Sequence, residues 1–292
     1  MKLGVSVVIP LYNKEELIES CLMSVINQSK KVDEIIIIND GSKDNSVNVV
    51  KDVIENNKDH NIILFEQENQ GVSVARNKGI SLASFEYICL LDADDLWKKE
   101  FISKVHELIY NYPDASMYCL GHEVVRKTGR FKPKHGLKNG FQGYVDDFFK
   151  SSLAGSVAKS SKVCIKKSKL EQGNLFPEGV TAGEDLYVWI SLALKGKVVC
   201  DTESLCIVNQ IEDESRGARV NSVPYPLEYY SRNKEELTFH AKNYISLIGY
   251  KHAISALFKG NINLFIKRWG LTYKFSRVRA VIPFYLIYIV IN

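Results

Sequence analysis

Four aliphatic runs alternate with helix-forming stretches over the first hundred residues. The runs cover 5–10, 34–38, 61–65 and 87–91, and each ends in polar or turn-forming residues. The stretches between them carry apolar side chains at helical spacing. They cover about 17–28 and 46–56, and a third stretch begins with residues 71–79. Strands that alternate with helices at this spacing predict a mostly parallel, doubly wound α/β sheet with helices on both faces.

The fourth run ends in three carboxylates, Asp92, Asp94 and Asp95. Ligands bind beyond the carboxyl ends of strands in open α/β sheets, so these acids are expected at a binding edge. Asp92 and Asp94 project to one side of an extended segment, and a divalent cation such as Mn²⁺ or Mg²⁺ is the simplest group to offset their repulsion. A polar strand end that caps a helix over about 97–110 is the alternative.

Other polar residues also fall at predicted strand ends. Tyr12 offers a stacking surface after the first strand, Asp40 an acceptor after the second, and Arg76 a planar donor in the third helical stretch. No G-x-G-x-x-G follows the first strand, which argues against a dinucleotide and favours a mononucleotide pocket. Loop packing and turn formation remain alternative roles. Asn13 and Glu16 are expected to form a capping box.

Composition is that of an ordinary globular protein: 292 residues, 46% hydrophobic and 25% charged. The six cysteines lack disulfide or zinc spacing, and we expect reduced core thiols in a cytosolic protein. We also expect no secretory signal, no spanning helix and no nucleic-acid partner. Between Lys251 and Asn292 there are seven Lys or Arg and no Asp or Glu, so the basic character is C-terminal.

Four ordered motifs carry a family resemblance. They are Val-Ser-Val-Val-Ile-Pro-Leu-Tyr-Asn at 5–13, Glu-Ile-Ile-Ile-Ile-Asn-Asp-Gly-Ser at 34–42, Asn-Gln-Gly-Val-Ser-Val-Ala-Arg-Asn at 69–77 and Leu-Asp-Ala-Asp-Asp at 91–95. Together they resemble family 2 glycosyltransferases, which are inverting enzymes of the GT-A fold. The resemblance resumes at 183–189, where Gly-Glu-Asp-Leu-Tyr-Val-Trp is similar to the family's Glu-Asp motif.

The resemblance implies a role for individual residues. Asp92 would touch the ribose, and Ala93 would belong to the donor-binding residues. Asp94 would bind the metal with Asp92 beside it, and Arg216 or Arg219 would contact the pyrophosphate. The uridine pocket would be lined by Pro10, Tyr12, Asn13, Asp40, Arg76 and Asn77. The donor would be a nucleotide-diphosphate sugar, most simply a UDP-sugar.

Chemistry assigns the remaining carboxylate. An acceptor hydroxyl has a high pKa, so a carboxylate on the face opposite the leaving group must take its proton, and we assign this to Asp185. Glu184 would bind the acceptor or shape the site. Enrichment of acids at a helix N-terminus is the alternative for both residues.

The leading hypothesis is therefore a metal-dependent sugar transferase in surface polysaccharide or glycolipid assembly. A nucleotide-sugar-binding or nucleotidyl-transferring protein, and an inactive partner-binding relative, are the competing hypotheses. Residues 1–220 would form the GT-A domain, with the donor half at 1–100 and the acceptor half at 101–220, and 221–292 a helical extension. Basic clusters at 126–138 and 159–169 would suit a lipid pyrophosphate-linked saccharide acceptor, or are solvated faces. No Gln-x-x-Arg-Trp motif of processive relatives is present, so we expect single-sugar addition.

The last apolar run, 281–291, follows several basic residues. As a helix it would be ~16 Å long, against ~30 Å for a hydrocarbon core, so we expect a re-entrant or interfacial anchor on the inner face of the cell membrane. A strand or helix that covers the core is the alternative.

Overall fold

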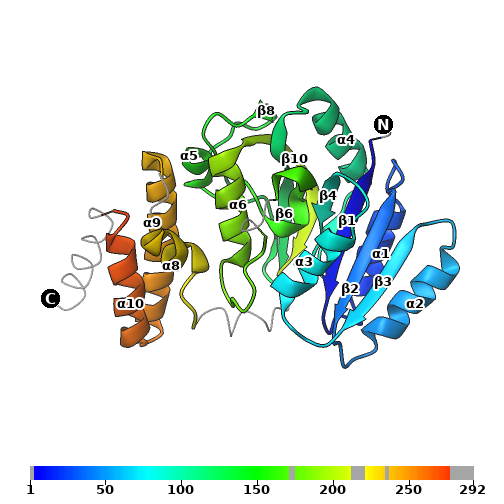
Figure 1. Ribbon diagram of the computed structural model, residues 1–292, viewed down its shortest axis with the longest axis horizontal. Coiled ribbons are helices and arrows are strands. Elements are labelled where there is room, and N and C mark those ends of the chain that lie inside the picture. The colour runs from blue at the N-terminus through cyan, green and yellow to red at the C-terminus, as the bar shows by residue number, and fades with distance from the viewer. Residues whose placement is uncertain (1–2, 171–174, 212–220, 234–236, 277–292) are drawn as a thin grey trace.

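The computed structural model describes residues 3–170, 175–211, 221–233 and 237–276. Within these ranges, ten strands form one sheet with the order β3-β2-β1-β4-β9-β6-β10-β5, while β7 pairs with β6 and β8 with β10 (Figure 1). Helices lie on both faces of the sheet, and a group of helices stands at the end of the molecule away from β3. This is the α/β architecture that the alternating pattern predicts.

The parallel part of the sheet comes from the first ninety residues. Its elements are β1 (Val5–Leu11), α1 (Ile18–Ile26), β2 (Glu34–Asp40), α2 (Ser46–Asn56), β3 (Ile62–Gln67), α3 (Val72–Leu82) and β4 (Tyr87–Leu90). Strand β1 lies between β2 and β4 and is parallel to both, and β3 is parallel to β2. Because β1, β2 and β4 run in one direction, their carboxyl ends meet at the same edge.

Alternate side chains of these strands enter two separate cores. Val7 and Ile9 of β1 pack with Ile18 of α1 and Val50 of α2 on one face. Val8 packs on the other face with the apolar side of α3. A Cβ on Gly79 of α3 would lie 2.3 Å from Val8 Cγ1, so this glycine permits the close approach of helix and strand.

The second half of the sheet is mixed rather than parallel. Its elements are β5 (Leu96–Trp97), α4 (Phe101–Asn111), β6 (Ala115–Arg126), β7 (Gly129–Phe131), β8 (Gln142–Tyr144), α5 (Phe148–Ser152), the short 3-10 helices η1 (Ser160–Lys162) and η2 (Lys167–Lys169), β9 (Val163–Lys166), α6 (Glu184–Lys195) and β10 (Lys197–Asn209). Strand β9 runs antiparallel to both β4 and β6, and β10 runs parallel to β6. The insertion of β9 joins the two halves into one sheet.

Three helices follow, α8 (Tyr225–Arg232), α9 (Phe239–Phe258) and α10 (Ile262–Tyr273). Leu227 and Ile248 belong to the same core cluster as Val8, and the Tyr244 ring contacts those of Phe148 and Phe149. The C-terminal region is helical, as predicted, and it packs on the sheet domain through this shared core. None of the helices in the described part of the chain is long and apolar enough to cross a membrane.

Two local predictions are wrong. Asn13 and Glu16 do not form a capping box, because Asn13 has φ +48° and its Oδ1 accepts from the Lys43 N–H, while α1 begins only at Ile18 without a side-chain cap. The helix expected from about residue 97 begins at Phe101, because Trp97 pairs with Cys206 of β10 in an extended conformation. In both places a contact distant in sequence overrides the local signal.

The core predictions are confirmed. All six cysteines are buried and form no disulfide. Phe148 and Phe149 are buried. Phe141 is partly buried and packs against the same core, and Tyr144 is partly buried and packs against the core on the other face of the sheet. These aromatics serve packing.

Candidate active site

Polar residues gather where β1, β2 and β4 end. Tyr12 and Asn13 follow β1, Asp40 ends β2, and the run from Asp92 to Asp94 follows β4. The shared strand direction brings these residues to one edge, as the sequence predicts. Tyr12 is 44% exposed, so its ring is available to a ligand.

Asp40 is buried and fully engaged with the loop before α3. Its Oδ1 accepts from Gln67 Nε2 and the Gln70 N–H, at 2.8 and 2.9 Å, and its Oδ2 accepts from the Gly71 N–H at 2.8 Å. Gly71 has φ +93°, a conformation that favours glycine. Asp40 therefore sets the start of α3, the helix that carries Arg76 and Asn77.

The loops after β1 and β2 are tied to each other. Asn13 N–H donates to Ser42 Oγ at 3.0 Å, Lys14 N–H to Ser46 Oγ at 2.8 Å, and Glu15 N–H to Asp44 Oδ2 at 3.0 Å. The side chains of Asn13 and Glu15 accept in return from backbone N–H groups of the second loop. These bonds fix the backbone that presents Tyr12.

Arg76 is the centre of the site. Its guanidinium is buried, with Nη2 2.7 Å from Asp92 Oδ1 and Nη1 3.5 Å from Glu184 Oε1, and the Phe176 ring lies 5.1 Å from Cζ. Burial lowers the pKa of Arg76, but Asp92 and Glu184 outweigh this effect and raise it. Its Nε has no hydrogen-bond partner among the described residues. Arg76 thus links the acids after β4 to the Glu-Asp pair of α6.

The three acids after β4 have different surroundings. Asp94 is partly exposed, and its Oδ2 lies 2.8 Å from Lys14 Nζ. Asp95 is buried, accepting from the Asn209 N–H at 2.8 Å and from the Ser161 hydroxyl, whose oxygen also accepts from the Asp92 N–H. Burial, with Asp92 nearby, raises the pKa of Asp95 to about 7. Asp95 therefore holds the turn in place, while Asp92 and Asp94 are partly exposed.

Glu184 and Asp185 form the first turn of α6. Gly183 precedes them with φ +77°, and Tyr225 N–H donates to the Ala182 carbonyl at 2.9 Å, so α8 supports this helix start. Glu184 is buried, and its Oε1 lies 3.5 Å from Arg76 Nη1. Asp185 is partly buried; desolvation and the neighbouring Glu184 raise its pKa to about 6. A carboxylate with this pKa is ionised at neutral pH and more basic than an ordinary one.

The remaining predicted residues contact neighbouring parts of the fold. Asn77 bonds both backbone groups of Phe176, so it fastens the segment that covers Arg76. Pro10 pairs with Ile38 in the sheet, and Ala93 is buried in the turn of the acids. Arg216 and Arg219 lie outside the described residues, as does the run 281–291, and their roles stay predictions.

Several contributors were missed at the sequence level. Lys14, Ser161 and Phe176 touch the site, yet no motif marks them, and Ser161 lies inside a cluster interpreted only by its charge. Lys162 of that cluster is buried, with Nζ 3.3 Å from the Ser156 carbonyl oxygen, so the cluster is not wholly a solvated face. These residues are recognised by their positions in the fold, because no sequence motif marks them.

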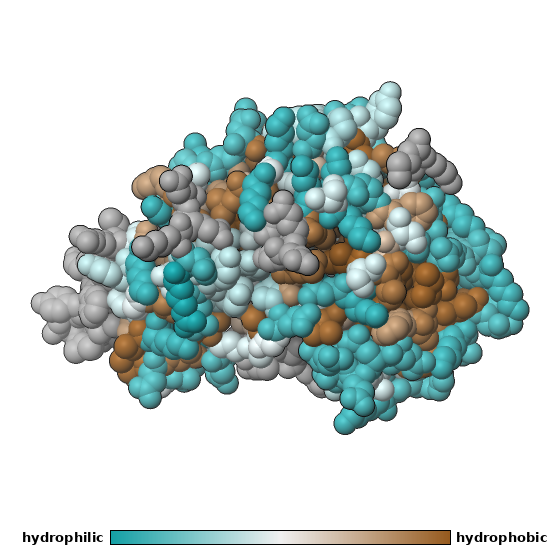
Figure 2. All heavy atoms as spheres, in the orientation of Figure 1, coloured by the Kyte–Doolittle hydropathy of each residue, from teal (hydrophilic) through white to brown (hydrophobic). Residues whose placement is uncertain are grey.

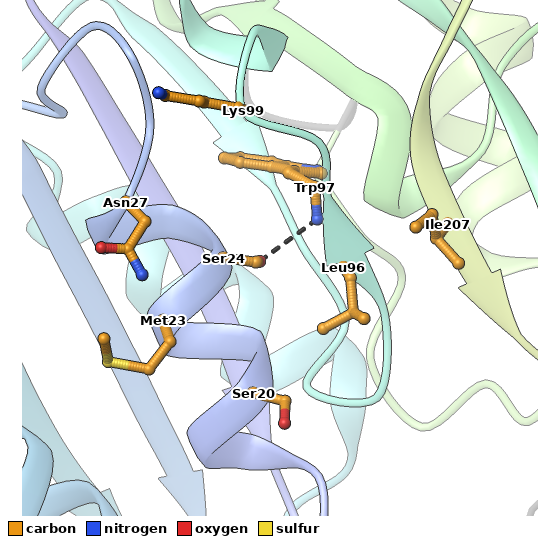
Figure 3. A pocket seen from close by; sticks show the side chains of 8 residues that line it. All are labelled: Ser20, Met23, Ser24, Asn27, Leu96, Trp97, Lys99 and Ile207. Carbon is orange, nitrogen blue, oxygen red and sulfur yellow. Dashed lines mark hydrogen bonds between the residues drawn. The ribbon is translucent and has the colours of Figure 1, made fainter.

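A hollow beside α1 contains none of the predicted site residues. It lies between α1 and β5, where the Trp97 N–H donates to Ser24 Oγ at 3.2 Å (Figure 3). Its lining consists of Ser20, Met23, Ser24, Asn27, Leu96, Trp97, Lys99 and Ile207. It offers one charged side chain, Lys99, and no carboxylate, so the candidate active site is the acid-lined edge.

Comparison with known proteins decides the family. The model of the family described as "Glycosyl transferase family 2" matches residues 6–162, more than half of the chain. The chain belongs to glycosyltransferase family 2. The matched residues include the strand ends, Arg76 and the acids after β4, so the resemblance carried by the motifs is confirmed.

Curated relatives support the same family. An "Uncharacterized glycosyltransferase" of Rickettsia felis is 31% identical over 66% of this chain, and the "Putative teichuronic acid biosynthesis glycosyltransferase TuaG" of Bacillus subtilis is 29% identical over 66% of it. The aligned parts are 31% and 73% of those two proteins. For "Glycosyltransferase GlyA" of Streptococcus pneumoniae the aligned part is 15% of that protein. This family 2 chain thus spans a third or less of some of its relatives.

Solved structures confirm the GT-A fold. TarS of S. aureus, in complex with UDP-GlcNAc, covers 94% of this chain with a TM-score of 0.64 at 17% identity, and 74% of that chain is matched. The mannosyltransferase PcManGT of Pyrobaculum calidifontis, in complex with GDP-Man and Mn²⁺, covers 95% with a TM-score of 0.65 at 18% identity, and 86% of that chain is matched.

Proposed function

We propose that this family 2 protein is a metal-dependent, inverting transferase. It moves one sugar from a nucleotide-diphosphate sugar, in the first place a UDP-sugar, to a saccharide or lipid-linked saccharide. The observation that carries the proposal is the pair of Arg76 contacts, 2.7 Å to Asp92 and 3.5 Å to Glu184. They join the acids suited to a donor diphosphate to the helix start that presents Asp185.

The acids after β4 fit a hard divalent cation. Asp92 and Asp94 would offer carboxylate oxygens to such an ion, and Asp94 Oδ2 lies 2.8 Å from the Lys14 ammonium in this structure. No cluster of three or more metal-ligating side chains occurs in the described ranges, so water and phosphate oxygens would have to supply the further ligands of Mg²⁺ or Mn²⁺. When bound, such an ion would neutralise charge on the departing nucleotide diphosphate. Asp95, held by Ser161 and Asn209, keeps the two ligands oriented.

Asp185 is the proposed general base. It would accept the proton of the acceptor hydroxyl as the new bond forms, on the face opposite the leaving nucleotide, and so invert the anomeric centre. Its pKa of about 6 keeps it ionised at neutral pH and improves its affinity for the proton. Glu184 is the poorer candidate, because it is buried and already paired with Arg76.

The nucleotide would lie along the ends of β1 and β2. Tyr12 is exposed for stacking, Asn13 ties the loops after β1 and β2 together, and Asp40 holds the start of α3. Arg76, Asn77 and Ala93 would line the rest of the pocket. The titles of the solved neighbours name UDP-GlcNAc and GDP-Man, which supports a nucleotide-sugar donor. The name of TuaG, a putative teichuronic acid biosynthesis glycosyltransferase, supports a place in polysaccharide biosynthesis.

A donor screen tests the proposal. Nucleotide release is measured with UDP- and GDP-sugars, with and without Mn²⁺ or Mg²⁺, and with candidate saccharide acceptors. We expect release that depends on both metal and acceptor, and a product whose anomeric configuration, determined by NMR, is opposite to that of the donor. Metal-independent turnover or a product of retained configuration would contradict the proposal.

A further inference from the structure

The turn between α9 and α10 exposes large apolar side chains. Phe258 is 85% exposed, Ile262 51% and Ile266 60%. In Figure 2 hydrophobic atoms reach the surface at the lower left, the end of the molecule that α9 and α10 form in Figure 1. We call Phe258, Ile262 and Ile266 the C-terminal apolar surface. Their exposure is costly in water, and such patches usually mark a binding surface.

A row of basic residues borders this surface. At about 100° per residue, Ile262 and Ile266 lie on one side of α10, and Lys267 and Lys274 lie roughly 100° further round. The buried residues Phe265, Arg268, Trp269 and Thr272 form the opposite flank. Helix α10 thus exposes an apolar ridge directly beside a basic one, the pattern of an interfacial helix.

The local charge is positive. Lys259 follows Phe258, Lys251 lies two turns before it on α9, and both are exposed. No Asp or Glu occurs between Lys251 and the end of the chain. Glu228 of α8 is the one acid paired with this group among the described residues, through Lys267 at 3.1 Å. Lys251, Lys259 and Lys274 have no carboxylate partner in the described ranges.

We propose that the C-terminal apolar surface inserts into the headgroup region of an anionic lipid bilayer. Phe258, Ile262 and Ile266 enter the boundary of the acyl chains, while Lys251, Lys259 and Lys274 contact the lipid phosphates. Charge complementarity favours a bilayer over a second copy of this chain, because two copies would bring their lysines together. The proposal uses only described residues and is independent of the apolar run 281–291.

The test is flotation of the full-length protein with lipid vesicles. Vesicles of phosphatidylcholine alone are compared with vesicles of phosphatidylcholine and phosphatidylglycerol at low salt. We expect binding to the mixed vesicles that weakens as salt is raised, because lysine–phosphate attraction is screened within about 10 Å at 0.1 M. The readout does not involve sugar transfer, so its failure is separate from failure of the proposed function.

Two variants dissect the surface. Phe258→Ser with Ile262→Ser should weaken partitioning into mixed vesicles at least about tenfold, because two apolar anchors are lost. Lys259→Gln with Lys274→Gln should weaken partitioning into mixed vesicles about 30-fold at low salt and much less at high salt. Tyr110→Ser is the matched control, since Tyr110 of α4 is 84% exposed but lies outside this surface.

Three outcomes would overturn the proposal. The first is that the wild-type protein does not float with mixed vesicles at low salt. The second is that Tyr110→Ser reduces binding as much as the serine pair. The third is that the serine pair converts an oligomer to a monomer in sedimentation without changing vesicle binding, which would assign the surface to a second copy. Circular dichroism of each variant checks that it is folded.

Discussion

The chemistry of the site depends on the distinct surroundings of single carboxylates. Asp92 faces Arg76, Asp94 faces Lys14, and Asp185 has a pKa raised to about 6 by desolvation and by Glu184. The proposed base must be ionised to accept a proton. We therefore expect the turnover rate to rise with pH through about 6 and to level off above it. A pH profile under saturating donor and acceptor measures this, and a rate that falls as pH rises through 6 would contradict the role.

A second prediction at the scale of single residues concerns Asp94. Asp94→Ala removes a carboxylate proposed to hold the cation, so the affinity for UDP in the presence of Mn²⁺ should fall at least about tenfold. Calorimetric titration of UDP, with and without Mn²⁺, measures the change. Asp114→Ala is the control, because Asp114 is exposed and pairs only loosely with Lys197 at 3.9 Å. Equal Mn²⁺-dependent affinity of Asp94→Ala and the wild type would refute the assignment.

At the scale of elements, α3 has to lie close to β1 to place Arg76. Gly79→Ala would set a Cβ 2.3 Å from Val8 Cγ1, and we expect it to destabilise the protein by about 1–3 kcal/mol. Gly270→Ala in α10 is the matched control, because no atom lies within 4 Å of its Cβ position. It should stabilise by about 0.5–1 kcal/mol through helix propensity. Urea unfolding measures both, and equal effects would disprove the close-packing argument.

The sequence predicts an element when the pattern that forms it is local. It misses the element when its position depends on contacts that are distant in sequence. The first four strands and three helices were predicted because their apolar periods are local. The pairing of β9 between β4 and β6 was not, since nothing in Val163–Lys166 encodes its neighbours. The site residues were predicted as a set by their motifs. Their partners were missed, because Arg76 meets Glu184 across 108 positions.

At the scale of the whole molecule, the C-terminal helices share a core with the sheet domain. Leu227 and Ile248 pack in the cluster that contains Val8, and the hydroxyls of Tyr230 in α8 and Ser191 in α6 are hydrogen-bonded at 2.9 Å. We therefore expect α8–α10 to unfold together with the sheet rather than as an independent domain.

A protein with Trp97→Phe and Trp189→Phe retains Trp269 of α10 as its only indole. The urea midpoint from Trp269 fluorescence should coincide with that from far-ultraviolet circular dichroism. Two separate transitions would show that 221–292 is a distinct domain.

The central claim is that Asp185 is the base of a transferase whose donor binds at the acids after β4. Its most direct test is Asp185→Asn, which keeps the shape of the side chain and removes the proton acceptor. We expect sugar transfer to fall about 10²- to 10⁴-fold, while the affinity for the nucleotide sugar with Mn²⁺ stays within a few-fold of the wild type. Wild-type turnover by the Asp185→Asn protein would contradict it.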